Sequence, residues 1–212
     1  MKKLIIFDMD GTLANTSLGI INSHRYAHKT MGRPIPNKST LENVIGGPLL
    51  GTYISKFGFS EAEARIAVSH YRKYYAETGL LEAELYPEIK ETLQSLKNKG
   101  HLLAVATLKA ECFVNKMLDS MGISLYFDAI FGMDDQDTRT KAQLIQMCME
   151  HLNIATSDDV VMVGDSIHDL NGAVQAGVSF IGVTYGFGFK PSDASIVDYT
   201  LCDSPLQLIE NI

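Results

Sequence analysis

The stretch KLIIFDMDGT, residues 3–12, decides the fold of this chain. Its apolar run, Leu4 to Phe7, is typical of a strand buried in a parallel sheet. The run ends at Asp8 and Asp10. Because side chains two residues apart on an extended segment point the same way, the two carboxylates can share one site. The carboxyl ends of strands are where open α/β sheets bind ligands, so the stretch predicts a polar site there; the plainer alternative is a strand that stops in a polar turn.

The composition is that of a globular protein with an acidic balance. The 212 residues suit one large domain or a core with a modest second unit, and 46% of them are hydrophobic, so a sizeable core can be buried. The net charge of −7 argues against binding of a nucleic-acid polymer, which needs a basic face. It does not exclude an anionic substrate, because a metal ion and one lysine can reverse the local charge.

Cysteine content and the amino terminus indicate a cytoplasmic protein that does not act at a membrane. Cys112, Cys148 and Cys202 are odd in number and widely spaced, so we expect reduced thiols in the core rather than disulfides or a zinc site. The apolar run from Leu4 to Phe7 is too short for a secretory signal and far too short to span a bilayer.

The pattern along the chain predicts an α/β core, residues 1–15 and 81–212, with a helical cap domain, residues 16–80, inserted into it. Within the insert, apolar residues recur at helical spacing, and Ser60 with Glu63 forms a capping box. The later strands expected in the core are 102–106, 128–132, 160–165, 180–184 and 199–201. Because strands and helices alternate, we expect right-handed crossovers and a doubly wound parallel sheet. An insert directly after the first strand's loop is placed to act as a lid.

More polar residues stand at the ends of the later strands or at the start of a helix. Thr107 ends the second expected strand, Asp165 ends the fourth with Asp169 four residues on, and Lys141 opens the helix before the fourth. Since the carboxyl ends of parallel strands meet at one edge, these groups are expected to lie near Asp8.

This set of residue types suits phosphate chemistry. Several carboxylates can share a small site only with a compensating positive charge, and oxygen ligands of this number suit Mg²⁺ together with a phosphate oxygen. One carboxylate can act as nucleophile and a second as general acid/base, while a hydroxyl and an ammonium hold the other phosphate oxygens.

The motifs resemble those of the haloacid dehalogenase (HAD) superfamily, mostly phosphatases, and in particular its phosphoglycolate phosphatase and 5′-nucleotidase-like branch with a helical cap. Four motifs occur in order: Asp8-x-Asp10-Gly11-Thr12, then Thr107, then Lys141, then Gly164-Asp165-x-x-x-Asp169. The first and fourth are highly specific, whereas a single Thr and a single Lys are weak. The resemblance covers essentially the whole chain.

The resemblance implies a role for each motif residue. Asp8 would be the nucleophile and Asp10 the general acid/base. The phosphoryl group would be bound by Gly11, Thr107 and Lys141. Mg²⁺ would be bound by Asp8, the backbone carbonyl of Asp10 and Asp165, and Asp169 would orient Lys141 or a metal-bound water. The implied activity is hydrolysis of a small phosphorylated metabolite, such as phosphoglycolate, a nucleoside monophosphate or a sugar phosphate, by a monomer or homodimer.

Several alternatives remain within and beyond this resemblance. The dehalogenases lack the second aspartate, so Asp10 favours phosphate chemistry. Phosphonatases add a cap lysine, and Lys29, Lys38 and Lys56 are more consistent with solvated surface charges. A phosphomutase of the same fold stays open, as does a non-catalytic regulatory or binding protein, because a fold alone does not establish activity.

Three further features each keep two interpretations. Lys109 either reaches a phosphate or simply begins a helix. His24, Arg25 and His28 either face a substrate or lie on the surface or in the core of the cap. The glycine-rich loop 184–188 either closes on the site or forms a flexible turn.

Overall fold

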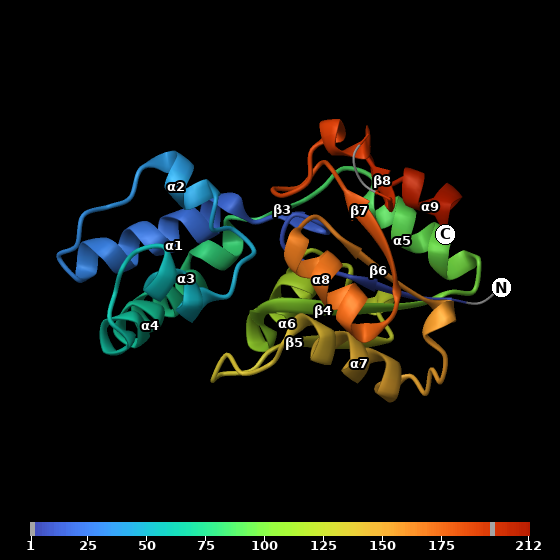
Figure 1. The fold of residues 1–212 in the computed structure, drawn as a ribbon, viewed down its shortest axis with the longest axis horizontal. Helices are drawn as coiled ribbons and strands as arrows, with labels where there is room; N and C mark the ends of the chain where they lie inside the picture. The colour runs from blue at the N-terminus through green and yellow to red at the C-terminus, as the bar shows by residue number, and fades with distance from the viewer. Residues whose placement is uncertain (1–2, 196–197) are drawn as a thin grey trace. The chain divides into compact units, whose positions relative to one another are not determined.

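The computed structural model describes residues 3–195 and 198–212, and the chain forms two compact units (Figure 1). The core unit comprises Met1–Asn15 and Leu85–Ile212, and the helical unit comprises Thr16–Glu84. The chain leaves and re-enters the core unit through two short strands that pair with each other, β2 (Ala14–Asn15) and β3 (Glu84–Leu85).

The core unit contains one six-stranded parallel sheet, which confirms the expected α/β class. Its strand order is β5-β4-β1-β6-β7-β8. The strands are β1 (Leu4–Phe7), β4 (Leu102–Ala110), β5 (Ala129–Met133), β6 (Val160–Gly164), β7 (Ser179–Val183) and β8 (Thr200–Cys202). The apolar strand β1 lies between β4 and β6 and is buried along its whole length, as its sequence predicts.

Helices cover both faces of the sheet. They are α5 (Ile89–Asn98), α6 (Glu111–Ser120), α7 (Lys141–His151), α8 (Ile167–Ala176) and α9 (Gln207–Asn211), with short 3₁₀ turns η2 (Ser124–Tyr126), η3 (Ser157–Asp159) and η4 (Pro191–Ser195). The chain steps from β1 through β4 to β5, and then from β5 to β6 in the opposite direction. Right-handed crossovers therefore put α5 and α6 on one face and α7 and α8 on the other.

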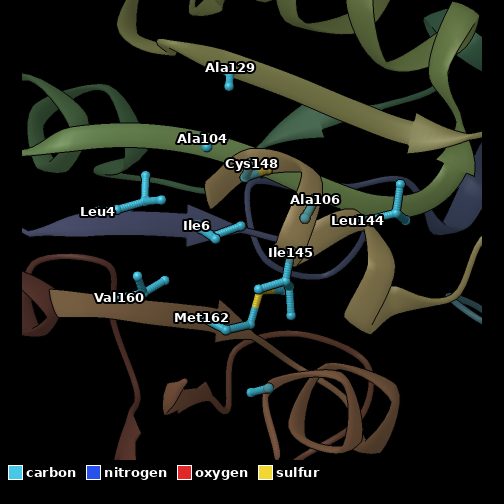
Figure 2. Close-up of a cluster of buried hydrophobic side chains, with 11 residues drawn as sticks. Leu4, Ile6, Ala104, Ala106, Ala129, Leu144, Ile145, Cys148, Val160 and Met162 are labelled. Carbon is cyan, nitrogen blue, oxygen red and sulfur yellow. The ribbon is translucent and has the colours of Figure 1, made fainter. Parts of the chain in front are cut away.

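The hydrophobic cluster between the sheet and α7 is built from alternate residues of the strands (Figure 2). Its buried members are Leu4, Ile6, Ala104, Ala106, Ala129, Leu144, Ile145, Cys148, Val160, Met162 and Ala173. Residues two apart on a strand share a face, so Leu4 and Ile6 pack under α7 while their neighbours turn to the opposite side. This packing fixes α7, and with it the helix's first residue, against the centre of the sheet.

Strand β4 is longer than the sequence suggested. It continues through Thr107 to Ala110, so the interpretation of Lys109 as the start of a helix is wrong. Ala106 pairs with Phe131 of β5, but the next pair is Ala110 with Met133, which marks an irregularity between them. Irregularities of this kind bend a strand and re-aim its side chains, here at the carboxyl edge of the sheet.

The helical unit contains α1 (Ser17–Thr30), α2 (Lys38–Glu42), α3 (Leu49–Ser55), α4 (Glu61–Glu77) and the 3₁₀ turn η1 (Gly79–Leu81). The capping box of Ser60 and Glu63 is present at the start of α4. His24 and His28 are buried in an aromatic cluster with Tyr53, so they pack within this unit. The Nδ1 of His24 lies 3.1 Å from the Tyr53 hydroxyl, and burial, reinforced by His28, lowers the pKa of His24 to about 3.

Two of the three cysteines lie in the interior. Cys148 and Cys202 are buried free thiols, as expected, whereas Cys112 is exposed and does not belong to the core. Among residues 3–195 and 198–212, no helix combines the length and the apolar character that crossing a membrane requires.

Candidate active site

Lys141 lies at the centre of a buried ionic cluster at the carboxyl edge of the sheet. Thr140 caps α7 in a capping box with Gln143, which places Lys141 at the first position of the helix. Its Nζ lies 2.7 Å from Oδ1 of Asp8 and 2.7 Å from Oδ1 of Asp169, and all three side chains are at most 8% exposed. The same ammonium donates to the Ala106 carbonyl at 3.0 Å. One lysine thereby joins the end of β1 to α8.

Asp169 is held by its own helix. Its Oδ2 accepts hydrogen bonds from the Ser166 amide at 3.0 Å and from the Ser166 hydroxyl at 2.6 Å, while Oδ1 faces Lys141. The stem of Lys141 passes directly over Gly172 of α8, where a Cβ atom would lie 2.3 Å from Cγ of the lysine. Gly172 of α8 thus makes room for the Lys141 side chain.

Three carboxylates could hold a cation together. Asp8, Asp165 and Asp169 each offer an oxygen, and these oxygens lie within 4.8 Å of one another. In the described part of the chain no lysine or arginine forms an ion pair with Asp165, whose side chain is buried. A buried carboxylate without a cation is costly, so the donor set fits a hard divalent ion.

The pKa values reflect this concentration of negative charge. Burial, with Asp169 and Asp8 nearby, raises the pKa of Asp165 to about 7, against the opposing effect of two backbone amides. Burial also raises the pKa of Asp8, although Lys141 opposes the shift. Burial alone would lower the pKa of Lys141, but Asp169 and Asp8 outweigh it and raise that pKa. Lys141 is therefore a permanent cation in the site.

Thr107 and Lys109 bring β4 into the site. The Thr107 hydroxyl helps to lower the pKa of Asp8, against the effect of burial, and it accepts a hydrogen bond from the Lys109 amide at 3.3 Å. The Nζ of Lys109 lies 3.0 Å from Oδ2 of Asp10, with both side chains at most 8% exposed. Lys109 is thus a second buried cation of the site, which the sequence-based set of site residues omitted. Its spacing of two from Thr107 along a strand was the available indication.

Gly11 lies beside Asp165 in the turn after β1. It has a φ of +81°, and a Cβ atom there would lie 2.2 Å from Oδ2 of Asp165, so the turn needs glycine on both counts. Its amide donates to the Ala14 carbonyl at 2.9 Å within the turn. The expected contact of Gly11 with a phosphoryl group stays a prediction.

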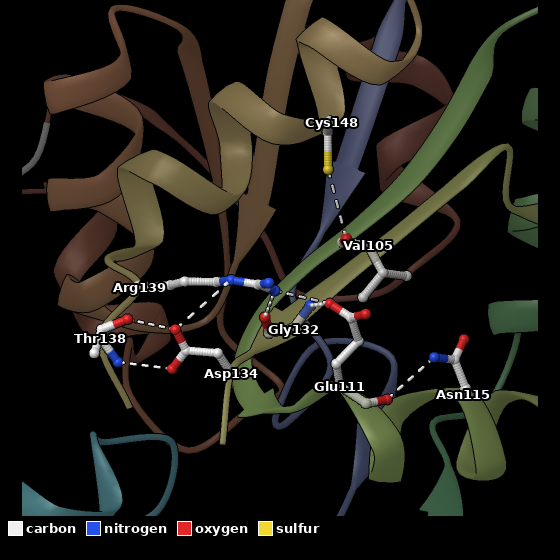
Figure 3. A network of polar contacts seen from close by, with 8 residues as sticks. All are labelled: Val105, Glu111, Asn115, Gly132, Asp134, Thr138, Arg139 and Cys148. Atoms are coloured by element: carbon white, nitrogen blue, oxygen red, sulfur yellow. Dashed lines mark hydrogen bonds and ion pairs between the residues drawn. The ribbon is translucent and has the colours of Figure 1, made fainter. Parts of the chain in front are cut away.

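A polar network holds the segment that leads into α7 (Figure 3). Nη1 of Arg139 donates to Oε2 of Glu111 at 2.9 Å and to the Gly132 carbonyl at 2.8 Å, and its Nε lies 3.9 Å from Oδ2 of Asp134. The Thr138 amide donates to Oδ1 of Asp134 at 2.8 Å. The network ties the loop before α7 to β5 and to the start of α6, which restrains the position of the helix that carries the site lysine.

The glycine-rich loop 184–188 closes on Asp165. The amides of Phe187 and Gly188 donate to Oδ2 of Asp165 at 2.6 and 3.2 Å. Of the two interpretations of this loop, contact with the site is the one the structure supports.

Comparison with known proteins defines the class. A family model described as haloacid dehalogenase-like hydrolase matches residues 5–183. The chain is 40% identical to a 5′-nucleotidase of Pseudomonas aeruginosa over 87% of this chain and 83% of that protein. It is 30% identical to a phosphoglycolate phosphatase of Vibrio parahaemolyticus over 98% and 95%. A crystal structure titled as a predicted phosphatase from Clostridium acetobutylicum superimposes with a TM-score of 0.91 at 34% identity, covering 100% of this chain and 98% of that one.

The parallel sheet, its acidic edge and these relatives define an α/β hydrolase that acts on phosphate monoesters. The chain belongs to the haloacid dehalogenase-like hydrolase family, and the resemblance inferred from its motifs is confirmed.

Proposed function

We propose that this protein is a Mg²⁺-dependent phosphomonoesterase that acts on a small phosphorylated metabolite through an aspartyl-phosphate intermediate. The observation that carries the proposal is the buried contact of 2.7 Å between Lys141 and Asp8. It places a fixed cation beside a carboxylate at the end of the central strand. A preorganised cation there can stabilise the charge that develops when a phosphoryl group is transferred.

In the first step, an oxygen of Asp8 attacks phosphorus, the bond to the leaving oxygen breaks, and Asp10 gives that oxygen a proton. In the second step, water attacks phosphorus, Asp10 takes a proton from the water, and Asp8 is released with inorganic phosphate. The phosphoryl oxygens are held by Gly11, Thr107 and Lys141. Asp169 keeps Lys141 in place, in line with their ion pair of 2.7 Å.

The proposed metal ligands are Asp8, the backbone carbonyl of Asp10, and Asp165. The proximity of the Asp8 and Asp165 carboxylates and the absence of an ion pair at Asp165 within the described residues support this set. Asp169 belongs to the same acidic group, but its oxygens already face Ser166 and Lys141. Bound Mg²⁺ would neutralise charge on the phosphoryl oxygens and on the carboxylates.

The substrate class follows from the relatives and from the charge of the chain. The relatives named above act on nucleotides or on phosphoglycolate, according to their names, so both belong in a first panel with sugar phosphates. The net charge of −7 disfavours a nucleic-acid polymer. We assign the helical unit the role of a cap that reads the leaving group and excludes water, in a cytoplasmic monomer or homodimer.

The test is turnover of an aryl phosphate by the wild-type protein and by Asp8→Asn. We expect the variant to fold, since the change is nearly isosteric, but to lose turnover; a chelator should abolish activity of the wild type, and added Mg²⁺ should restore it. Ranking kcat/KM across the metabolite panel then identifies the substrate. Turnover by Asp8→Asn at the wild-type rate would remove Asp8 as nucleophile. Activity that survives the chelator would remove the metal dependence.

A further inference from the structure

The loop 184–188 hydrogen-bonds one oxygen of Asp165. Oδ2 of Asp165 accepts the amide of Phe187 at 2.6 Å and the amide of Gly188 at 3.2 Å. A carboxylate oxygen has two lone-pair positions, so two donors use the full capacity of Oδ2. The other oxygen, Oδ1, is left as the one available to a cation.

The approach of the loop to Asp165 requires its glycines. A Cβ atom at Gly186 would lie 2.3 Å from the Gly11 carbonyl oxygen and 2.5 Å from Cβ of Asp165. At Gly188 it would lie 2.3 Å from the Asp165 carbonyl oxygen. Real Cβ atoms do not tolerate such distances, so any other residue at either position would push the loop away from the carboxylate.

Two more hydrogen bonds anchor the loop on either side of the glycines. The Phe189 amide donates to the Asp165 carbonyl at 2.8 Å, and the Tyr185 hydroxyl donates to the Thr12 carbonyl at 3.2 Å. Tyr185 also packs edge-on against Tyr86. The loop is therefore fixed to both acidic segments of the site, after β1 and after β6, and can hold Asp165 in one orientation.

The number of oxygens that a carboxylate offers bears on which cation a site prefers. Mg²⁺ demands near-octahedral geometry and takes carboxylates through single oxygens, whereas Ca²⁺ accepts six to eight ligands and often takes both oxygens of a carboxylate. A carboxylate with one oxygen already saturated can still coordinate Mg²⁺ through its other oxygen. It cannot offer Ca²⁺ both of its oxygens.

We propose that the loop 184–188 makes Asp165 a one-oxygen ligand and thereby biases the site toward Mg²⁺ and against Ca²⁺. Phe187 and Gly188 act as positioning residues through their amides, and Gly186 permits their approach. The proposal rests on the proposed function only in placing Asp165 among the metal ligands.

The test is calorimetric titration of MgCl₂ and CaCl₂ into the metal-free full chain, for the wild type, Gly186→Ala and Gly188→Ala. The matched control is Gly51→Ala in α3, where the added Cβ meets only Pro48 at an ordinary 3.6 Å. We expect the two loop variants to bind Mg²⁺ about 10- to 100-fold more weakly, as is usual when a group that orients a ligand is lost. Ca²⁺ binding should fall less, so the ratio of the two dissociation constants moves toward Ca²⁺; the control should leave both constants unchanged.

Equal weakening of both ions, or no change in Mg²⁺ affinity, would overturn the proposal. If neither ion binds the wild type, the metal dependence in the proposed function fails as well, so the two failures are distinguishable. Infrared difference spectra of the wild type cover the case in which the loop variants do not fold. With Asp165→Asn as reference, the Asp165 carboxylate should show the wide splitting of one-oxygen coordination with both ions. A narrow splitting would also overturn the proposal.

Discussion

The ammonium of Lys141 lies 2.7 Å from the carboxylate of Asp8, although the two residues are 133 positions apart in sequence. The sheet brings β1 to its centre, and the packing of α7 on that sheet carries the lysine to the end of the strand. Both side chains are buried, so neither charge is satisfied by water. The first prediction follows from this dependence.

Lys141→Met should remove the cation that Asp8 and Asp169 share. Because removing one partner of a buried ion pair leaves an uncompensated charge, we expect a loss of about 3–5 kcal/mol in the free energy of unfolding. Turnover of an aryl phosphate should fall by about 10²–10³-fold, as for loss of one preorganised donor. Denaturant unfolding and steady-state kinetics measure the two effects. Lys97→Met is the control, because its ion pair with Asp128 is far more exposed. Unfolding free energies that match for the two variants would contradict the prediction.

Lys109→Met should impair Asp10 rather than the binding of phosphate. The ammonium of Lys109 holds Oδ2 of Asp10 at 3.0 Å, and Asp10 is the proposed proton donor to the leaving oxygen. A good leaving group needs little protonation, so an alkyl phosphate should lose more kcat/KM than a nitrophenyl phosphate. Equal losses for both substrates, with weaker inhibition by inorganic phosphate, would instead assign Lys109 to the phosphoryl group.

The helical unit should lose stability as the pH falls. Burial lowers the pKa of His24 from 6.5 to about 3 and also lowers the pKa of His28. The unfolded chain then binds more protons than the folded one below pH 6.5. The stability is fully present above that pH and decreases as the pH falls toward about 3. Urea unfolding between pH 7 and pH 4 should show a shallower decrease for His24→Phe, which keeps a ring in the aromatic cluster. An unchanged slope would show that His24 does not contribute.

Asp165 should give the opposite dependence in metal-free protein. Burial and the neighbouring aspartates raise its pKa from 3.8 to about 7, so between these values the folded chain holds a proton that the unfolded chain has lost. This contribution is present below pH 3.8 and is lost as the pH rises toward 7. With a chelator present, the free energy of unfolding of the wild type should therefore decrease relative to that of Asp165→Asn as the pH rises from about 4 to 7. Adding MgCl₂ at pH 7 should stabilise the wild type only. A difference that stays constant with pH would contradict the assignment.

The sequence determined the fold class and most of the polar residues that meet at the carboxyl edge of the sheet. Leu4 to Phe7 predicted the central strand because a continuous apolar run of that length is buried on both faces. The spacing of Asp8 and Asp10 located the site, and the alternation of strands and helices gave the parallel sheet. Ser60 and Glu63 predicted the start of a helix, because a capping box depends only on residues that are close in sequence.

Only the tertiary structure decided which residues from distant segments interact with each other. Lys109 pairs with Asp10, and its spacing from Thr107 gave only a local indication of its direction. The partner itself depends on β4 lying beside β1 in the folded sheet. The glycines at 186 and 188 indicated only that the loop could approach another segment closely. The carboxylate that it approaches, Asp165, directly follows a different strand, β6. The periodicity of a strand or helix depends on consecutive residues, so the sequence shows it directly. An ion pair or a close backbone approach between distant segments forms only after the sheet has packed and fixed the positions of their ends.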